Sequence, residues 1–522
     1  MTLMSSRTEN SARNLIVALA GQGISILLTF LSRTVFLHTL GSTYLGINGL
    51  FSNVLTFLNL AELGVGSAIT FSLYEPLAEN NKYRIASIMW LYKKIYCFIG
   101  MIVLALGFLL TPFIRFFITS DTEISYVEVY FALYVINTGI SYFFSYKRTL
   151  IAADQKQYIN TIYQYAAMIV QNIIQIILLF LTHNFVVFLM IQVAATLVQN
   201  VAISIKANKM YPYLKNKDIP EIEKSVFVTI KKNTKAMLLH KVGSAVVNST
   251  DNILISKLIS IVTVGIYSNY SLVLGALNQL LGQFFTAISA SVGNLGAEQD
   301  KKALKAAFDK VFFLNFWMYT FCTICCACLF QPFVSLWIGS DMLLGIPVLF
   351  VILLNFYMNG MRKCVLTFRE SLGLYWYDRY KPAFESVINL GASILLAMKF
   401  GILGIFVGTT ISCVTTSLWV EPYILCKYGF ENKYLNLRTY FIRFLFYTVI
   451  GVFDLMICLG AVNMVSVTGI AGFVIKVIIA VLISNAFLVF VFFRNDNFEW
   501  LYHTVRHFLE RITRKRGDSD VL

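Results

Sequence analysis

Long apolar runs alternate with short polar segments along the whole chain. Each run is long enough to cross a hydrocarbon core of about 30 Å as a single helix. The pattern therefore predicts an all-α polytopic membrane protein with about fourteen transmembrane helices. The predicted spans lie near residues 14–38, 46–73, 89–114, 126–146, 159–182, 184–205, 236–259, 262–290, 311–333, 342–361, 382–399, 402–426, 441–462 and 468–493.

Lys and Arg concentrate in alternate connections between these runs. The segments on one side, which include both chain ends, hold 36 of the 42 Lys and Arg residues. The bias keeps its sign from the first connection to the last, and one missed span would reverse it from that point on. Because cytoplasmic loops carry an excess of Lys and Arg, we expect both termini in the cytoplasm.

Composition agrees with a membrane protein. Hydrophobic residues make up 58% and charged residues 13% of the chain, and the mean hydropathy is +0.71. Soluble domains are about 45–50% apolar and about 25% charged. The first run is a full span without a cleavage site, so no cleavable signal peptide is predicted. The net charge of +15 does not indicate nucleic acid, because the basic residues are spread between apolar runs.

The chain repeats itself at an offset of 219 residues. Residues 13–70 align without gaps with 232–289, and twelve of the 58 positions are identical, including Gly46 and Gly265. The order Ser-x-Val-Leu-x-x-Leu-Asn occurs in both copies. Both copies start on the predicted cytoplasmic side, so the repeat is parallel, about an axis along the membrane normal.

This repeat predicts two six-helix lobes and an appended helix pair. Two like lobes around a central axis favour a transporter that works by alternating access. The tail has an amphipathic helical pattern; it either lies on the inner membrane surface or is a partly ordered solvated tail. The predicted parts are an N-lobe at 1–205, a basic cytoplasmic linker at 206–235, a C-lobe at 236–426, the appended pair at 427–493 and the tail at 494–522.

Ionisable residues inside spans are costly and therefore mark candidate sites. Arg33 lies in the first span, and the repeat places it opposite Asn252, next to Asp251 in the seventh span. Arg33 and Asp251 should thus lie at similar depth and could face one cleft. The alternatives are snorkelling of Arg33 to the outer surface and an incidental helix contact for Asp251. Asp454 and Lys476, in the appended pair, could simply pair with each other.

Glu62 lies deep in the second span, within Asn59-Leu-Ala-Glu-Leu-Gly-Val-Gly66. The glycines permit close backbone approach or a local break. Glu62 is either part of a functional site or a structural partner for a neighbouring helix.

Three other features are weaker candidates. His240 and Lys241 open the seventh span and could hold a phosphate, although positive-inside anchoring explains them as well. Amides recur in the spans and mostly should bond helix to helix. Asn59 and Asn278, which the repeat pairs, are candidates for a polar route suited to sugar hydroxyls.

Soluble-enzyme chemistry has no visible motif in the sequence. There is no Gly-rich phosphate loop with its lysine and no metal-ligand spacing, and most of the nine cysteines lie within apolar runs. The predicted external connections are mostly short, whereas an enzyme acting on the outer face usually needs a sizeable loop. We therefore expect a transporter rather than an enzyme, without a cofactor other than a coupling H⁺ or Na⁺.

Several short motifs recur along the chain. They are Arg33 with the Leu-Gly…Gly turn at 40–46, Glu62-Leu63-Gly64, the basic loop at 146–156, 251–256 with 264–270, and the stretch at 378–412. Together these motifs resemble the bacterial polysaccharide repeat-unit flippases, in the superfamily that also holds multidrug and toxin extruders and lipid II flippases. The resemblance covers about residues 10–430, and the stretch at 378–412 is similar to the branch that exports capsule, O-antigen or teichoic-type units.

The resemblance implies a flippase that moves an undecaprenyl-pyrophosphate-linked oligosaccharide from the inner to the outer leaflet of the bacterial cytoplasmic membrane. Arg33 would contact the sugar or pyrophosphate, Glu62 and Asp251 would couple or gate, and His240 and Lys241 would meet the pyrophosphate. A polysaccharide polymerase is a further partner to expect. The single intramembrane Arg of the first span argues against lipid II as the substrate.

Two other functions compete with this one. The first is a multidrug or toxin extruder of the same fold, which typically has twelve spans. The second is a membrane glycan polymerase or ligase, which would need a large external loop. The extra helix pair and the 378–412 stretch favour glycan export.

Overall fold

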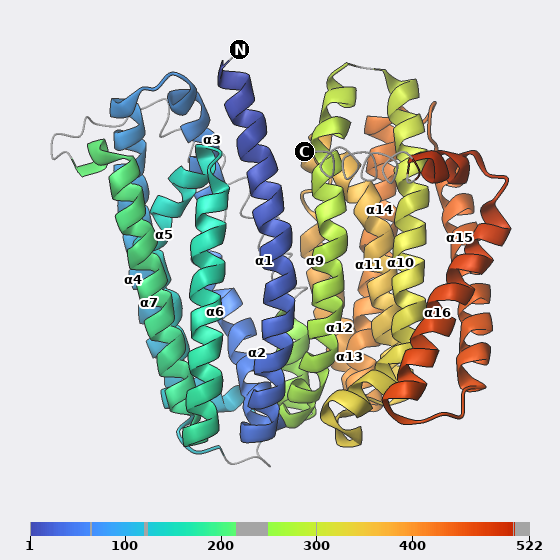
Figure 1. The fold of residues 1–522 in the computed structure, drawn as a ribbon, viewed down its shortest axis with the longest axis horizontal. Helices are drawn as coiled ribbons and strands as arrows, with labels where there is room; N and C mark the ends of the chain where they lie inside the picture. The colour runs from blue at the N-terminus through green and yellow to red at the C-terminus, as the bar shows by residue number, and fades with distance from the viewer. Residues whose placement is uncertain are drawn as a thin grey trace, which may run out of the picture. The chain divides into compact units, whose positions relative to one another are not determined.

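A computed structural model describes residues 2–62, 65–119, 124–215, 249–298, 300–504 and 506 (Figure 1). Helices dominate this described part, and it contains no β-strand. The chain divides into two compact units, Met1–Ser268 and Asn269–Leu522. The predicted all-α fold is confirmed, whereas the lobe boundaries at 205 and 236 stay a prediction.

The described residues of the first unit form α1 to α7, a helical segment at 249–258 and the start of α9. The α-helices are α1 (Thr2–Leu40), α2 (Ser42–Leu58), α3 (Val65–Ala78), α4 (Lys82–Leu110), α5 (Val127–Ala153), α6 (Gln157–Thr182), α7 (Phe185–Met210) and α9 (Ile261–Ala297). Short 3₁₀ turns lie at η1 (Asn59–Glu62), η2 (Thr111–Phe117) and η3 (Pro212–Lys215).

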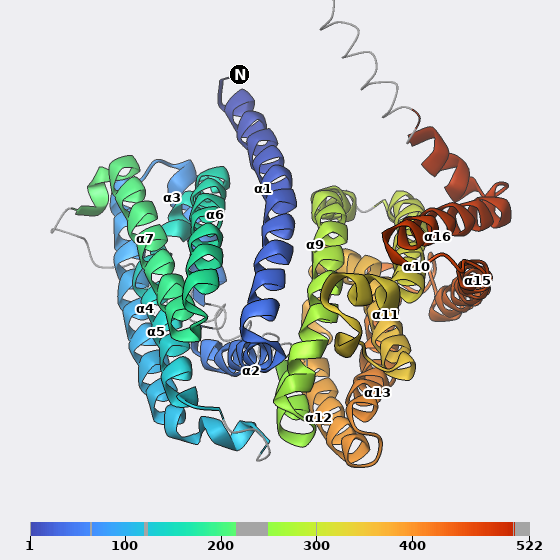
Figure 2. The same cartoon turned by 60° about the horizontal axis from the view of Figure 1, so that its bottom comes forward.

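The second unit contains the rest of α9 and a second helix bundle (Figure 2). Its helices are α10 (Lys301–Ile338), α11 (Ile346–Ser371), α12 (Lys381–Phe400), α13 (Ile402–Ser412), α14 (Leu418–Ile424), α15 (Leu437–Asn463) and α16 (Gly469–Phe492). The π-helical segment η6 (Cys413–Ser417) joins α13 to α14, and a second one, η7 (Leu425–Gly429), follows α14, so that Ile402–Gly429 is one long span. Short 3₁₀ turns lie at η4 (Ser340–Met342) and η5 (Leu374–Trp376).

Twelve helices of the described residues are long and apolar enough to cross a membrane, and each matches one predicted span. The structure gives a different outcome for each of the two remaining predicted spans. The run at 46–73 is not one continuous helix, because the 3₁₀ turn η1 separates α2 from α3. The run at 236–259 lies outside the described residues except for 249–259, of which 249–258 is helical. The predicted count of about fourteen is therefore approximately right, with an interrupted second span.

Small residues let the helices of the first unit pack closely. A Cβ at Gly107 of α4 would lie 2.4 Å from Val135 of α5, and one at Gly139 of α5 would lie 2.4 Å from Leu104 of α4. Close approach at small residues is the usual way in which membrane helices gain van der Waals contact, since lipid tails are as apolar as the side chains.

In the second unit, α15 and α16 pack side by side and both contact α10 (Figure 2). Tyr447 of α15 stacks on Phe316 of α10 with ring centroids 4.3 Å apart. The Ser484 hydroxyl of α16 donates to the Asp454 carboxylate of α15 at 2.8 Å, and Cys458 lies 3.4 Å from its other oxygen. The prediction that Asp454 pairs with Lys476 is wrong, because a serine and a cysteine satisfy this carboxylate instead.

The start of the predicted tail is helical. Residues 496–504 form a helix, and Phe498 stacks on Trp317 of α10 at 5.7 Å. The rest of the tail lies outside the described residues except for residue 506. At least the first turn of the tail therefore uses its apolar face to contact the bundle.

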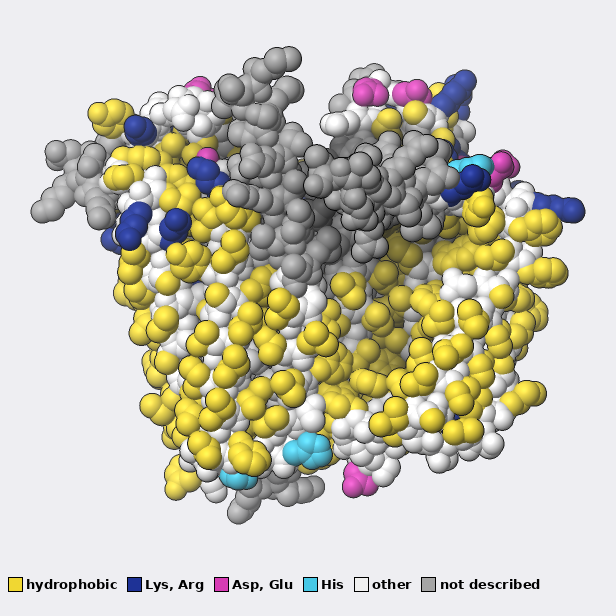
Figure 3. Space-filling view, in the orientation of Figure 1, with side chains coloured by type: hydrophobic (Ala, Val, Ile, Leu, Met, Phe, Trp, Pro, Cys, Tyr) yellow, Lys and Arg dark blue, Asp and Glu magenta, His cyan; other side chains and the backbone are white. Residues whose placement is uncertain are grey.

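The surface of each unit has the distribution that a bilayer requires. In Figure 3, hydrophobic side chains cover the middle of the face shown on either unit, and Lys and Arg gather toward one end. In the first unit, the start of α4, the end of α5 and the end of α7 pack around one cluster of buried residues, and these segments contain Arg84, Lys147 and Lys209. The basic residues therefore collect at one end of the bundle, as the alternation in the sequence predicted.

The two copies of the repeat meet symmetrically within the first unit. A Cβ at Gly46 would lie 1.9 Å from the Ile261 carbonyl oxygen, and one at Gly265 would lie 2.1 Å from the Ser42 carbonyl oxygen. At the offset of 219 residues, Gly46 corresponds to Gly265 and Ser42 to Ile261. The two contacts are thus the same contact made twice, as at an interface related by a two-fold axis. These two contacts agree with the repeat at the positions that they join.

Candidate functional site

Glu62 lies at the helix break between α2 and α3, where Asn59 and two glycines interrupt the apolar run. The Tyr96 hydroxyl of α4 donates a hydrogen bond to its carboxylate Oε1. A Cβ at Gly66 would lie 2.9 Å from the Tyr96 hydroxyl and 3.7 Å from that same oxygen. Gly66 thus provides the close approach expected of the glycines, and η1 provides the expected break.

Buried tyrosines surround this carboxylate. Tyr142 of α5 donates to Asn59 Oδ1 at 2.9 Å, and Tyr92 of α4 shares a hydrogen bond of 3.0 Å with Thr149. The Tyr92 and Tyr96 rings pack edge to face at 4.4 Å. Tyr92, Tyr96 and Tyr142 are all buried, whereas Glu62 is partly accessible. The Glu62 carboxylate is therefore reachable from outside the helix bundle and is backed by phenol groups. We call these residues the Glu62 cluster (Asn59, Glu62, Tyr92, Tyr96, Tyr142).

Arg33 points into the first unit rather than away from it. Its Nη1 donates to Ser268 Oγ at 3.2 Å, and Ser268 Oγ donates to the Gly265 carbonyl at 2.8 Å. The same symmetry applies here: Arg33 corresponds to Asn252, and Ser268 corresponds to Gly49. A Cβ at Gly49 would lie 3.7 Å from Asn252 Nδ2, so the contact recurs in the other copy.

Two of the other predicted residues, Asp251 and Asn278, lie in different units and are described separately. Asp251 lies on the helical segment 249–258 and is partly buried. Asn278 lies in the second unit, on α9, and accepts a hydrogen bond of 3.4 Å from the Tyr319 hydroxyl. Asn59 and Asn278, paired by the repeat, therefore each receive a tyrosine hydroxyl. His240 and Lys241 lie outside the described residues.

The second unit contains a buried ion network that the sequence did not reveal. Arg362 of α11 donates from Nε and Nη2 to both oxygens of Glu421 of α14, at 3.0 and 2.7 Å. Lys381 at the start of α12 also pairs with Glu421, and Glu385 lies 3.9 Å from Arg362. Two cations and two anions balance, which offsets the large cost of removing each from water.

This network lies where the helix geometry changes. Glu421 is on α14, and the π-helical segments η6 and η7 lie directly before and after that helix. Single π-turns in α-helices occur frequently at functional sites. Arg362 Nη1 also reaches the Asn359 side chain at 2.7 Å and Cys413 Sγ, in the first residue of η6, at 3.7 Å.

Sequence reasoning missed these residues for an identifiable reason. Arg362 and Lys381 fall in the connection between the predicted spans 342–361 and 382–399, where Lys and Arg fit the orientation rule. The structure extends α11 to Ser371, so Arg362 lies more than two turns before the end of the helix. Glu421, an acidic residue inside a predicted span, was the signal that could have revealed the network.

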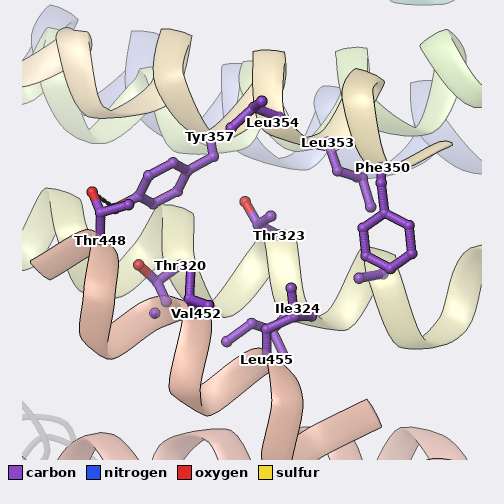
Figure 4. A pocket seen from close by; sticks show the side chains of 12 residues that line it. Thr320, Thr323, Ile324, Phe350, Leu353, Leu354, Tyr357, Thr448, Val452 and Leu455 are labelled. Carbon is purple, nitrogen blue, oxygen red and sulfur yellow. Dashed lines mark hydrogen bonds between the residues drawn. The ribbon is translucent and has the colours of Figure 1, made fainter. Parts of the chain in front are cut away.

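An apolar pocket of about 300 Å³ lies between α10, α11 and α15 (Figure 4). In Figure 4, Leu354 and Phe350 of α11 lie across from Val452 and Leu455 of α15. Its few polar atoms are hydroxyls, and two of them, on Tyr357 and Thr448, bond to each other at 3.1 Å. The pocket therefore suits a hydrocarbon chain and offers little to a sugar.

The fold is similar to that of known multi-pass membrane transporters. It matches the structure of the lipid II flippase MurJ in an inward closed conformation with a TM-score of 0.65 and 12% identity, over 92% of this chain and 99% of that one. It matches an inward-facing multidrug resistance MATE family transporter of the MOP superfamily with a TM-score of 0.61 and 14% identity, over 80% and 99%. For a mutant of the Vibrio cholerae MATE transporter VcmN the TM-score is 0.56 at 12% identity, over 81% and 98%.

The sequence itself identifies the family. The family described as polysaccharide biosynthesis protein matches residues 11–289, more than half of the chain. The chain therefore belongs to this family of polysaccharide biosynthesis proteins. A search of curated proteins found no significant match.

Proposed function

We propose that the protein is a flippase for an undecaprenyl-pyrophosphate-linked oligosaccharide repeat unit, which it moves from the inner to the outer leaflet of the bacterial cytoplasmic membrane. The observation that carries this proposal is family membership over residues 11–289, on a fold shared with the lipid II flippase MurJ. The basic end of each helix bundle faces the cytoplasm, and both termini lie there. A polymerase that consumes the flipped units is the partner expected on the outer face.

The two parts of such a substrate need different surroundings. Its polyprenyl chain is hydrocarbon, and the apolar pocket between α10, α11 and α15 matches that chemistry. Its pyrophosphate and sugars need cations, amides and hydroxyls. Arg33 is the proposed contact to them in the first unit, and His240 and Lys241 meet the pyrophosphate at the cytoplasmic mouth.

Transport against a gradient needs an energy source, and we assign coupling to carboxylates. Glu62 is partly accessible and is bonded to a tyrosine rather than to a basic residue in the contact that the structure shows. It can therefore exchange H⁺ or Na⁺ without first breaking an ion pair. Asp251 is the second candidate. The structural likeness to MATE transporters keeps an ion-coupled drug extruder as the alternative function.

Deletion of the gene in its own host separates the two functions. We expect loss of a surface polysaccharide, accumulation of its lipid-linked unit inside the cell and unchanged sensitivity to cationic drugs. A matched strain should carry the gene with Gly460→Ala, a change on α15 where a Cβ meets nothing within 4 Å. Normal surface polysaccharide together with increased drug sensitivity would establish the extruder instead.

A further inference from the structure

A second, polar pocket lies within the second unit, between α9 and α11. It has a volume of about 450 Å³, and side chains with hydroxyl, amide or charged groups dominate its lining. None of its lining residues belongs to the apolar pocket or to the buried ion network. The polar residues that matter are Gln279, Gln283 and Thr286 of α9 and Lys363, Thr367 and Glu370 of α11.

Lys363 is the unusual member of this pocket. It lies within α11, eight residues before the helix ends at Ser371, which is about 12 Å along the axis at about 1.5 Å per residue. Among the described residues, its ammonium group has no hydrogen-bond or ion-pair partner. Its neighbour Arg362 points to another face of the helix and is fully paired with Glu421.

An unpaired ammonium group inside a span is costly unless water or a ligand reaches it. An apolar residue at position 363, of the kind found at most other positions of α11, would not have this free-energy cost. Among the described lining residues Glu370 is the one carboxylate, and it lies 3.4 Å from Arg369. The pocket therefore offers a positive group that is available to an anion.

Two amides add a second kind of recognition. Gln279 and Gln283 are one helical turn apart on α9, and neither side chain has a partner among the residues that the structure describes. Each amide offers two N–H donors and a carbonyl acceptor, which is the combination that pairs with vicinal hydroxyls. A free cation beside free amides matches a phosphate group joined to a hydroxyl-rich moiety.

We propose that the pocket between α9 and α11 binds a sugar phosphate head group, with Lys363 on the phosphate and Gln279 and Gln283 on sugar hydroxyls. The proposal rests on the proposed function, because a lipid-linked glycan carries both groups together. A phospholipid such as phosphatidylglycerol shares phosphate and hydroxyl chemistry, so the experiment must distinguish the two sources.

The test uses the full-length protein in nanodiscs of phosphatidylcholine. Two fluorescent probes are compared by anisotropy: a short-chain polyprenyl pyrophosphate that carries a disaccharide, and the same pyrophosphate without sugar. We expect Lys363→Gln to weaken binding of both probes about tenfold, since a charge-assisted hydrogen bond is lost. Gln279→Leu with Gln283→Leu should weaken only the probe that carries sugar.

The controls decide between the possible outcomes. Lys302→Gln, which removes an exposed lysine near the start of α10, should leave both affinities unchanged. Lys363→Arg should restore binding of the bare pyrophosphate, and the glutamine pair tests the site independently if Lys363→Gln is unstable. Wild-type binding that no variant weakens would overturn the site alone. Displacement of both probes by phosphatidylglycerol, with no benefit from the sugar, would also overturn it. Absence of wild-type binding to either probe would overturn the site and the proposed function together.

Discussion

The chemistry of Glu62 depends on which residues are beside it. Its carboxylate accepts a hydrogen bond from the Tyr96 phenol, and Gly66 leaves room for that contact. In contrast, Glu421 in the second unit is buried and held by Arg362 and Lys381. The two membrane carboxylates thus have opposite surroundings. Glu421 is neutralised by fixed cationic partners, whereas Glu62 has a neutral partner, as the proposed coupling role requires.

The first prediction is that Glu62→Gln abolishes coupling without disrupting the fold. Glutamine keeps the size and the acceptor oxygen for Tyr96 but removes the charge that would bind H⁺ or Na⁺. We expect glycan export to fall about tenfold. The corresponding free energy lies within the range of about 1–3 kcal/mol that is typical of coupling between sites. Export should also lose its dependence on the ion gradient. The measurement is surface polysaccharide in a deletion strain, together with probe transport into liposomes under imposed H⁺ or Na⁺ gradients.

Glu128→Gln is the matched control in the same unit. Glu128 is at the start of α5 and pairs with the exposed Arg115 in η2. Exposed ion pairs contribute about 0–1 kcal/mol, so this variant should export normally. Equal export by Glu62→Gln and Glu128→Gln would show that Glu62 is a structural partner of Tyr96.

Among the elements, the interrupted helices differ in how far the sequence predicts them. The break between α2 and α3 could be expected, because Asn59, Glu62 and neighbouring glycines disfavour a continuous apolar helix. The π-helical segments around Glu421 could not, since their sequences, Cys413–Ser417 and Leu425–Gly429, read as ordinary helix. These segments flank Glu421, whose partners Arg362 and Lys381 come from α11 and α12, and such tertiary contacts leave no local pattern in the sequence.

The second prediction concerns α15, which borders the apolar pocket. A Cβ at Gly451 would meet Thr320 of α10 at 3.2 Å, so a larger side chain there enters the pocket. If Gly451→Phe displaces two methylenes of a bound polyprenyl chain, at about 0.8 kcal/mol each, affinity should fall about tenfold. Binding of a polyprenyl phosphate probe to the purified protein measures this directly.

Gly460→Phe provides the comparison on the same helix. A Cβ added at Gly460 would have no neighbour within 4 Å, and Gly460 is not part of the pocket lining. Both variants add the same side chain to α15, so their common effect on helix stability cancels. Unchanged probe affinity in Gly451→Phe would show that the chain binds elsewhere.

At the scale of the whole molecule, the sequence predicted the transmembrane helices better than it predicted the functional residues. The apolar runs, the alternating Lys and Arg and the repeat all have local or periodic patterns, and the structure confirms twelve matching spans among the described residues. Arg33 and Glu62 could be named because a charge inside an apolar run is visible in one dimension. Lys363 could not, because its lack of a described partner depends on which face of α11 meets Glu421 and which meets α9.

The last prediction follows from the repeat, because the repeat relates the contact at Gly46 to the equivalent contact at Gly265. Gly46 and Gly265 occupy equivalent positions, and each touches a backbone carbonyl of the other copy. A Cβ at Gly265 would lie 2.1 Å from the Ser42 oxygen, so Gly265→Ala must push α2 and α9 apart. Overpacking of this kind costs about 1–3 kcal/mol. We therefore expect a lower unfolding temperature of the purified protein and reduced export, and by symmetry the same from Gly46→Ala.

Gly275→Ala is the control for these variants, because it also changes α9 but should stabilise the helix rather than destabilise it. A Cβ at Gly275 meets nothing within 4 Å, and alanine favours a helix over glycine by about 1 kcal/mol. This variant should keep or slightly raise the unfolding temperature. Gly46→Ala and Gly265→Ala should thus resemble each other and differ in sign from Gly275→Ala. If either of them behaves like Gly275→Ala, the close contact between the two copies is not maintained in the membrane.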